Sequence, residues 1–261
     1  MKKLVRRFLV VLGRLLGLKV NGPFRRYLTF SEAQSLAAKI NMILGMQLQG
    51  DAILKTARII RGIEARMIGR IAGDVDDHIL NYYLIKHAAN KLSEDIVFVE
   101  IGVLFGGSSL VMMQALKDSG IQRKILAIDP LDSYYGENED PITLLPITRN
   151  NVLVNVSSAN LSTKNFTLIS TLSQLPQTVG SLRDVEIGVI YIDGDHSYEG
   201  VKRDWDNYSP LVVQGGYVLI DNYHDDYEGI DRFVDEEVIP YCMGWIVAGT
   251  VNRSIVLMKK E

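Results

Sequence analysis

The sequence predicts an α/β protein built on a doubly wound sheet of seven strands, mostly parallel, with an antiparallel pair of strands at its C-terminal end. From Asp95 onward, short apolar runs of strand type alternate with segments of helical periodicity, which is typical of a parallel sheet covered on both faces. Acidic, amide and imidazole side chains directly follow two of these runs. Ligands bind beyond the carboxyl ends of the strands in such sheets, so we expect a functional site there.

Length and composition fit one large domain with an accessory region. The chain has 261 residues, and 47% of them are hydrophobic, which is enough for a sizeable core. The single cysteine, Cys242, excludes an intramolecular disulfide framework and a multi-cysteine metal site. We predict a basic N-terminal segment over residues 1–30, a helical accessory region over 31–94 and the main domain over 95–261.

Charge is distributed unevenly along the chain. Residues 1–31 carry eight basic side chains and no acidic one, whereas the remainder carries a net charge of −11, which argues against a nucleic-acid partner. On a helix, residues 1–20 would gather apolar side chains on one half and basic side chains on the other. Such a helix can lie on an anionic membrane surface, or it can dock on its own domain or on a second copy of the chain in a homo-oligomer. It is too short to span a bilayer because Arg14 interrupts the apolar run, so we expect a cytoplasmic protein, with peripheral contact at the inner face of the membrane as an alternative.

Three helices are expected ahead of the sheet. Ser31 and Gln34 have the spacing of a capping box, with Ser31 as the N-cap of the first helix. Helical periodicity then covers residues 32–47, 51–71 and 77–92, and these helices should cover one edge or face of the sheet.

The elements of the sheet are expected in regular alternation. The polar segment 134–148 follows a strand end and is expected to form a loop over the site. We predict strands over 96–101, 124–129, 166–169, 187–192, 216–220, 245–248 and 254–258, with helices over 107–119, 150–159, 198–208 and 229–238.

The first strand leads into a glycine-rich turn that starts at Glu100 and contains Gly102, Gly106 and Ser108. Glycines at a strand-to-helix turn let a ligand approach the backbone closely, although a plain tight turn is the alternative. The spacing is neither GxGxxG nor that of a Walker loop, which favours a cofactor without phosphates over a dinucleotide. Asp129 ends the second strand, where a carboxylate can accept hydrogen bonds from ribose hydroxyls or cap a helix.

Oxygen ligands and an imidazole follow the fourth and fifth strands. Asp193, Asp195 and His196 come after the fourth strand, and Asp221 and Asn222 come after the fifth. Carboxylate and amide oxygens suit Mg²⁺, and an imidazole of ordinary pKa can act as a general base near neutral pH. The sequence leaves open whether Asp193 or Asp195 faces the metal, and each of these residues could instead cap a helix or form a turn.

Taken in order, these motifs resemble those of class I S-adenosylmethionine-dependent methyltransferases, which have a Rossmann-like fold. The pairing of Tyr-Ile-Asp-Gly-Asp-His-Ser-Tyr with Ile-Asp-Asn is most similar to the metal-dependent O-methyltransferases. These include the macrocin and mycinamicin sugar O-methyltransferases, a group also called cephalosporin hydroxylase-like, and more distantly the catechol and caffeoyl-CoA enzymes. The resemblance covers roughly residues 95–258. The pair Asp221-Asn222 is of the catechol type where sugar-type enzymes often have Glu-Asp, which leaves the acceptor class open.

The resemblance implies an S-adenosylmethionine- and Mg²⁺-dependent O-methyltransferase that acts on a hydroxyl of a sugar, a glycan or a related polyol or natural product. Alternatives are a catechol-like small-molecule O-methyltransferase, a non-methylating enzyme of the same fold, and a membrane-associated scaffold that binds the cofactor without turnover. The implied cofactor-binding residues are Glu100, Gly102, Gly106, Ser108 and Asp193, with Asp129 at the ribose and Ser173 and Gln174 at the adenine. The implied metal ligands are Asp193, Asp221 and Asn222, and the implied catalytic base is His196.

Overall fold

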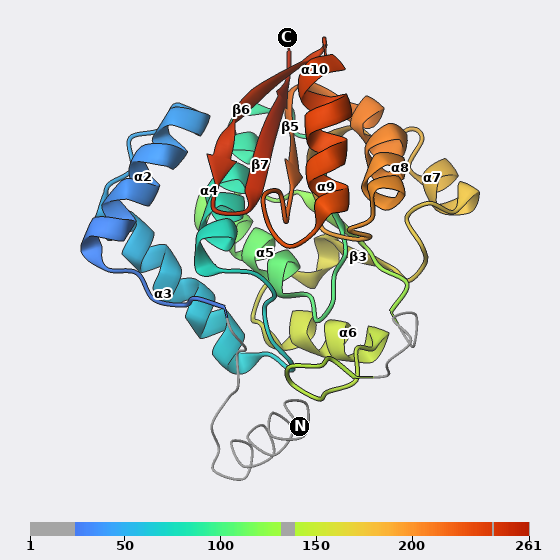
Figure 1. The fold of residues 1–261 in the computed structure, drawn as a ribbon. Helices are drawn as coiled ribbons and strands as arrows, with labels where there is room; N and C mark the ends of the chain where they lie inside the picture. The colour runs from blue at the N-terminus through green and yellow to red at the C-terminus, as the bar shows by residue number, and fades with distance from the viewer. Residues whose placement is uncertain (1–23, 132–138, 242, 261) are drawn as a thin grey trace, which may run out of the picture.

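A computed structural model describes residues 24–131, 139–241 and 243–260. The described chain contains strands β1 Val97–Ile101, β2 Lys124–Ile128, β3 Phe166–Ile169, β4 Ile187–Ile192, β5 Val212–Ile220, β6 Trp245–Val251 and β7 Ser254–Lys259. They form one sheet in the order β3-β2-β1-β4-β5-β7-β6 (Figure 1). The first five strands are parallel, and β7 runs antiparallel to both β5 and β6. The predicted fold class is confirmed.

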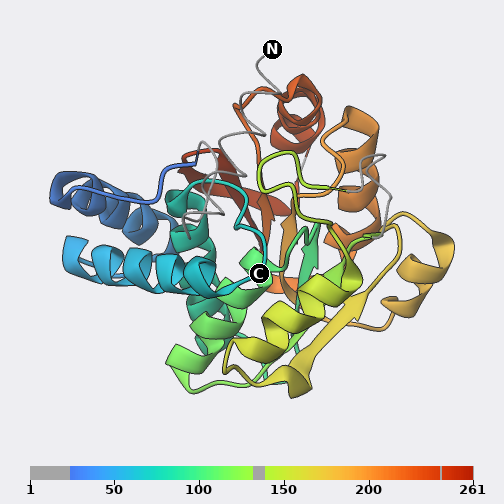
Figure 2. The same cartoon turned by 90° about the horizontal axis from the view of Figure 1, so that it is seen from below.

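Helices cover both faces of the sheet (Figures 1 and 2). The predicted helix over 229–238 is a short α-helix that continues as a π-helix over Val234–Val238. The sequence predicted neither the short helices over Pro176–Ser181 and Ile239–Tyr241 nor the 3₁₀ turns over Thr163–Asn165 and Ser209–Leu211. The helices are α2 Phe30–Leu44, α3 Gly50–Arg66, α4 Val75–Lys91, α5 Gly107–Ser119, α6 Arg149–Ser158, α7 Pro176–Ser181, α8 Tyr198–Tyr208, α9 Glu228–Phe233 and α10 Ile239–Tyr241.

Two apolar cores lie on opposite faces of the sheet because successive strand residues point to opposite sides. In β1, Phe98 joins the core formed with α2 to α6, whereas Val97 and Val99 join the core formed with α8 and α9. Figure 2 shows α2 and α3 side by side, projecting beyond α4. The predicted accessory helices therefore extend one of the two cores, and the division at residue 94 stays a prediction.

The first described helix begins earlier than the sequence suggested. Thr29 is the N-cap of α2, and its side chain accepts a hydrogen bond from the Glu32 backbone N–H at 3.3 Å. The Glu32 carboxylate accepts the Thr29 backbone N–H at 2.7 Å, which completes a capping box. The prediction of Ser31 and Gln34 as the box is wrong because Thr29 and Glu32 have the same spacing, and a carboxylate is a stronger acceptor than an amide oxygen.

The basic segment predicted over residues 1–20 lies outside the described residues. Among the helices that the structure does describe, none combines the length and the apolar character needed to cross a bilayer.

A buried ion pair supports the connection between α3 and α4. Arg26 is 5% exposed and Glu64 is 1% exposed, and they are joined by two hydrogen bonds of 2.7 and 2.9 Å. Arg26 also donates to the carbonyl oxygens of Ile71 and Gly73, at 2.7 and 2.6 Å. The pair thereby fixes the backbone of a connection that reaches the candidate site described below.

We expect Arg26→Met to lower the free energy of unfolding by about 3 kcal/mol, because it leaves the Glu64 carboxylate buried without its cation. The matched control is Arg232→Ala, which removes an exposed pair with Glu236 and should change stability by roughly 0–1 kcal/mol. Urea denaturation of both variants measures the two effects. Equal losses would show that burial does not increase the contribution of the Arg26–Glu64 pair to the free energy of unfolding.

Candidate active site

The candidate site lies where the direction of strand succession reverses. β2 and β3 lie on one side of β1, and β4 and β5 lie on the other, so the topological switch point of the sheet lies between β1 and β4. The Asp193 backbone N–H donates to Ile101 at 2.9 Å, and the Asp221 N–H donates to Ile192 at 3.0 Å. These bonds hold the ends of the central strands level, so Gly102, Asp193 and Asp221 emerge at one edge.

The turn after β1 requires glycine at two positions. Gly102 has φ +89° and Gly106 has φ +82°, in the left-handed region that favours glycine. A Cβ on Gly102 would overlap the carbonyl oxygen of Asp193. The turn is therefore packed directly against the end of β4, and Gly106 is the N-cap residue of α5.

Glu100 is a fully buried carboxyl group beneath this turn. Ser109 donates a hydrogen bond to its Oε2, whereas Oε1 has no hydrogen-bond partner among the described residues. Burial raises the pKa of Glu100 to about 8, against hydrogen bonds from Ser109 and Ser108 that lower it. Burial therefore favours the uncharged form of this carboxyl group.

Three carboxylates gather at the ends of β4 and β5. The Ser254 hydroxyl lies 2.8 Å from Asp221 Oδ1 and 3.2 Å from Asp77 Oδ1. Burial and the charge of Asp221 raise the pKa of Asp77 to about 7 and that of Asp193 to about 6. A bound cation would offset this concentration of negative charge.

His196 is held beside Asp193. Its Nε2 lies 3.3 Å from Asp193 Oδ1, and its ring packs edge-on against Tyr227 at a centroid distance of 4.2 Å. Burial lowers the pKa of His196, but the hydrogen bond and charge of Asp193, with further carboxylates nearby, outweigh burial and raise it overall. The imidazole is thus oriented by a carboxylate and by an aromatic ring.

Two cavities meet at His196. The carboxylate cavity, of about 240 Å³, is lined by Asp193, Asp221 and Asn222, and the Ser173 cavity, of about 620 Å³, is lined by Ser173 and Gln174. Both cavities are bordered by four residues: Gly102, Gly194, His196 and Tyr227. The geometry thus places the imidazole and the glycine turn between a large cavity and a cluster of oxygen donors.

Residues 99–223 match the profile of a protein family described as a methyltransferase domain. The chain is therefore similar to methyltransferases over the part that carries the candidate site. The match runs from β1 to just beyond β5 and includes Gly102, Gly194 and His196, which border both cavities. The predicted resemblance to class I methyltransferases is confirmed.

Solved structures and a curated relative are similar to the chain. The O-methyltransferase NovP superposes with a TM-score of 0.54 at 18% identity, over 89% of this chain and 100% of NovP. CalS11, a TDP-rhamnose 3′-O-methyltransferase of calicheamicin biosynthesis, gives 0.54 at 13% identity, over 89% of this chain and 96% of CalS11. The uncharacterized protein R132 of Acanthamoeba polyphaga mimivirus is 30% identical over 148 residues, which is 56% of this chain and 60% of the relative. The structural matches establish the fold.

Within the matched region, Asp129 supports the glycine turn. Its Oδ2 accepts the backbone N–H groups of Val103 and Leu104 at 2.7 and 3.1 Å, and its Oδ1 accepts that of Leu131 at 2.9 Å. The residue is 1% exposed. Its contact with a ribose stays a prediction, and it requires the carboxylate to become accessible from the Ser173 cavity.

The structure distinguishes between the two aspartates that the sequence left open. Asp193 lines the carboxylate cavity with Asp221, whereas Asp195 lines the Ser173 cavity and accepts the Ser197 backbone N–H at 3.0 Å. Ser197 is the N-cap of α8, so Asp193 does not cap that helix. Asp193 is therefore the better placed metal ligand of the two.

The donor set for a metal is small. Among the described residues, no group of three or more His, Cys, Asp or Glu side chains is arranged to hold a metal ion. Asp193 and Asp221 contribute carboxylates, and Asn222 adds an amide whose Nδ2 donates to Asp225 at 3.1 Å. The Asn222 amide oxygen can then act as a ligand. An all-oxygen set of this size fits Mg²⁺, which commonly keeps several positions for water or substrate.

Ser173 is tied to a buried carboxyl group that the sequence did not reveal. Its hydroxyl donates to Asp204 Oδ1 at 2.6 Å, and its carbonyl accepts the Tyr208 hydroxyl at 2.5 Å. Asp204 is fully buried on α8, and burial raises its pKa to about 7. Gln174 accepts a hydrogen bond from Arg203 at 3.2 Å. Helix α8 thus fixes both residues predicted to contact the adenine.

We expect Asp204→Asn to flatten the dependence of stability on pH. Because the pKa of Asp204 rises from 3.8 to about 7 on folding, the folded protein binds this proton more tightly, and stability falls as pH rises through that window. The loss is at most about 1.4 kcal/mol per pH unit. Urea denaturation across the window should show a smaller slope in the variant. Asp206→Asn, on the exposed side of the same helix, should keep the parent slope.

The sequence did not reveal several residues of the site. Phe24, Arg70, Tyr227 and Arg253 line the carboxylate cavity, and Asp77 lies beside Asp221. They come from connections and from α4, and all of them except Tyr227 lie far from the motifs in the chain. The available signal was the glycine spacing around Arg70, where α3 ends at Arg66 instead of continuing to residue 71 as predicted.

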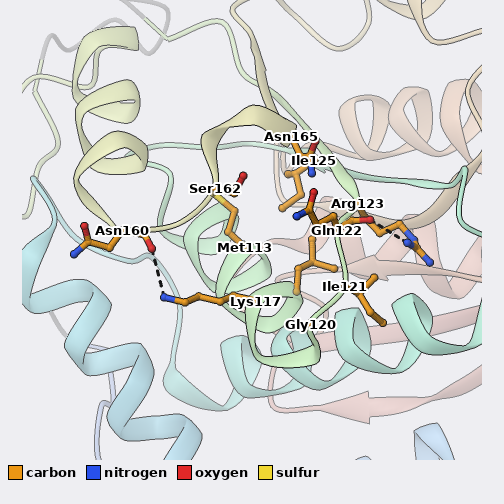
Figure 3. A pocket seen from close by; sticks show the side chains of 11 residues that line it. Met113, Lys117, Gly120, Ile121, Gln122, Arg123, Ile125, Asn160, Ser162 and Asn165 are labelled. Atoms are coloured by element: carbon orange, nitrogen blue, oxygen red, sulfur yellow. Dashed lines mark hydrogen bonds between the residues drawn. The ribbon is translucent and has the colours of Figure 1, made fainter.

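A third cavity lies at the amino-terminal ends of the strands. Figure 3 shows the side chains that line it. This amino-edge cavity, of about 340 Å³, lies between the end of α5, the start of β2 and the residues before β3. Lys117 extends across it toward the backbone oxygen of Asn160, at 3.4 Å. None of its described lining residues is acidic, and it shares no residue with the other two cavities.

Proposed function

We propose that the protein is an S-adenosylmethionine-dependent O-methyltransferase that acts on a hydroxyl of a sugar, a glycan or a related polyol with the help of Mg²⁺. The observation that carries the proposal is the position of His196 on the boundary between the two cavities. A methyl donor in the Ser173 cavity and a hydroxyl in the carboxylate cavity would meet at this imidazole.

Similarity to characterised proteins supports this choice. NovP is an O-methyltransferase, and CalS11 methylates the 3′-oxygen of TDP-rhamnose, a nucleotide sugar. A nicotinamide oxidoreductase would share the sheet, but the turn from Gly102 to Gly106 lacks the pyrophosphate-binding spacing.

The cofactor would occupy the Ser173 cavity. Gly102 lines this cavity and begins the glycine turn, which continues to Gly106 and Ser108. Ser173 and Gln174, held by α8, also line the cavity and would contact the adenine. A large, partly apolar cavity with a few placed polar groups is typical of a cofactor site.

When bound, S-adenosylmethionine would supply the methyl group, and Mg²⁺ on Asp193, Asp221 and Asn222 would lower the pKa of the acceptor hydroxyl. His196 would accept the proton of that hydroxyl while Asp193 and Tyr227 keep the imidazole in place. The remaining contribution of the chain is positioning, because the two cavities hold the reacting groups on either side of one side chain.

Metal binding would change the pKa of His196 through the charge on the nearby carboxylates. The raised pKa of His196 results from nearby carboxylates acting against burial. A divalent cation on Asp193 and Asp221 would screen that charge, lower the pKa of His196 and favour the neutral imidazole that a base requires.

Calorimetric titration of S-adenosylmethionine, with and without Mg²⁺ and with NADH as a control, tests the proposal. We expect micromolar binding of S-adenosylmethionine and no binding of NADH. Absence of S-adenosylmethionine binding under both conditions would refute the methyltransferase activity.

Removal of the metal should abolish turnover. Excess EDTA is expected to stop methyl transfer, and added Mg²⁺ is expected to restore it, because the acceptor hydroxyl would lose its Lewis acid. Binding of S-adenosylmethionine should persist in EDTA, since Ser173, Gln174 and the glycine turn are independent of the metal. A rate that is unchanged in EDTA would exclude the metal-assisted mechanism.

A further inference from the structure

A buried guanidinium lies on the wall of the carboxylate cavity. Arg70 is 8% exposed and pairs with the fully buried Asp140 through Nε, at 3.2 Å from both carboxylate oxygens, and through Nη2, at 2.9 Å. Its Nη1 is buried and has no hydrogen-bond partner among the described residues. Asp140 therefore fixes the guanidinium but leaves one of its three nitrogens available.

A second guanidinium lies close to the first. Arg253 donates from Nη1 to Asp225 at 2.5 Å, and its Nε has no partner in the described part of the chain. The guanidinium carbons of Arg70 and Arg253 lie 5.2 and 5.8 Å from the ring centroid of Phe24. All three side chains line the carboxylate cavity, so two guanidinium groups lie near one aromatic ring of its lining.

The backbone at Arg70 is fixed by its neighbours. Gly69 has φ +80°, and a Cβ there would overlap the ring of Phe105. The connection that carries Arg70 is therefore packed tightly against the turn after β1. The guanidinium is held in place before any ligand binds, as expected of a group that selects a ligand.

A buried N–H donor without a partner is unfavourable, and an oxyanion is the group that satisfies it best. Asp193 and Asp221 would be occupied by Mg²⁺, and Asp140 and Asp225 already accept hydrogen bonds from the two arginines. We propose that the acceptor substrate carries an oxyanion, a carboxylate or a phosphate, which Arg70 binds through Nη1 with Arg253 beside it. This inference rests on the proposed function, because it assigns the carboxylate cavity to the acceptor.

Calorimetry on the full chain with S-adenosylhomocysteine and Mg²⁺ tests the inference. The probes are D-glucuronate, D-glucose 6-phosphate and neutral D-glucose. We expect at least one anionic sugar to bind ten-fold or more tightly than glucose, and the better of the two identifies the carboxylate or the phosphate. Equal affinities for charged and neutral sugars, or no binding of either anion, would overturn the inference.

Substitutions show whether Arg70 is responsible. Arg70→Gln should weaken binding of the preferred anion about ten-fold or more and leave glucose unchanged, and Arg70→Lys should restore part of the preference. The double variant Arg70→Gln/Asp140→Asn removes both buried charges. It therefore tests the role of Arg70 without leaving the Asp140 carboxylate buried and unpaired. Lys117→Gln, in the amino-edge cavity, should bind like the parent. An anion preference that survives in both Arg70→Gln variants would contradict the assignment.

The two proposals can fail separately. If S-adenosylhomocysteine binds but the anions show no preference, the acceptor inference fails and the methyltransferase proposal stands. If S-adenosylhomocysteine and S-adenosylmethionine both fail to bind the parent, the proposed function fails, and the acceptor inference fails with it.

Discussion

Replacing Gly102 with alanine is expected to abolish binding of S-adenosylmethionine and to lower the free energy of unfolding by at least ~3 kcal/mol. The new Cβ would overlap the carbonyl oxygen of Asp193, and the backbone would also be strained at φ +89°. Since the clash is with backbone and not with a flexible side chain, the turn and the end of β4 must move apart. Calorimetry and urea denaturation measure the two losses.

Gly120 provides a matched control for the strain alone. It also has a positive φ, of +67°, but a Cβ there meets no atom within 4 Å. Gly120→Ala should therefore lose about 1–2 kcal/mol of stability and keep its affinity for S-adenosylmethionine. If Gly102→Ala behaved like Gly120→Ala, the close packing of the turn against Asp193 would not matter for the cofactor.

The second large effect is expected from His196→Ala, which should lower kcat by about 10²- to 10⁴-fold, the usual contribution of a general base. The variant should retain binding of S-adenosylmethionine, because the other residues that line that cavity, Ser173 and Gln174 among them, are unchanged. The parent rate should increase with pH as the imidazole loses its proton. That increase should be absent from the variant, since the residue that titrates is gone.

The control for His196 is a histidine on a neighbouring loop. The His224 side chain is 63% exposed and lies 3.8 Å from Asp231, so His224→Ala should leave kcat and its pH dependence unchanged. If a variant of His196 kept full kcat, His196 would not be the general base. A variant that loses cofactor affinity instead would make it a binding residue.

Elements with strong local patterns were predictable from the sequence. β4 and α8 occur as expected, over Ile187–Ile192 and Tyr198–Tyr208, because a continuous apolar run ends in a polar cluster and a serine N-cap follows. The glycine turn was equally visible, because its backbone conformation restricts the residue type. Where two local signals competed, as at Thr29 and Ser31, the choice depended on whether a carboxylate or an amide stood three residues after the cap.

The parts of the site that depend on tertiary packing were not predictable. Arg70 was expected inside a helix, but α3 ends before it, and the guanidinium then meets Asp140 across 70 residues of sequence. Asp77 was expected on a helix without any role, and it lies beside Asp221 because α4 packs against the sheet. No periodicity or spacing in the sequence encodes such contacts.

The hydrogen bonds of the Ser254 hydroxyl determine when the candidate site can form during synthesis. It is hydrogen-bonded to Asp77, 177 residues earlier in the chain, and to Asp221. Asn252 and Arg253 donate to Asp77 as well. The carboxylates therefore acquire their partners after the ribosome has added the β6–β7 hairpin. Contacts of such long separation slow folding, so we expect strands β1 to β5 to pair before these carboxylates acquire their partners.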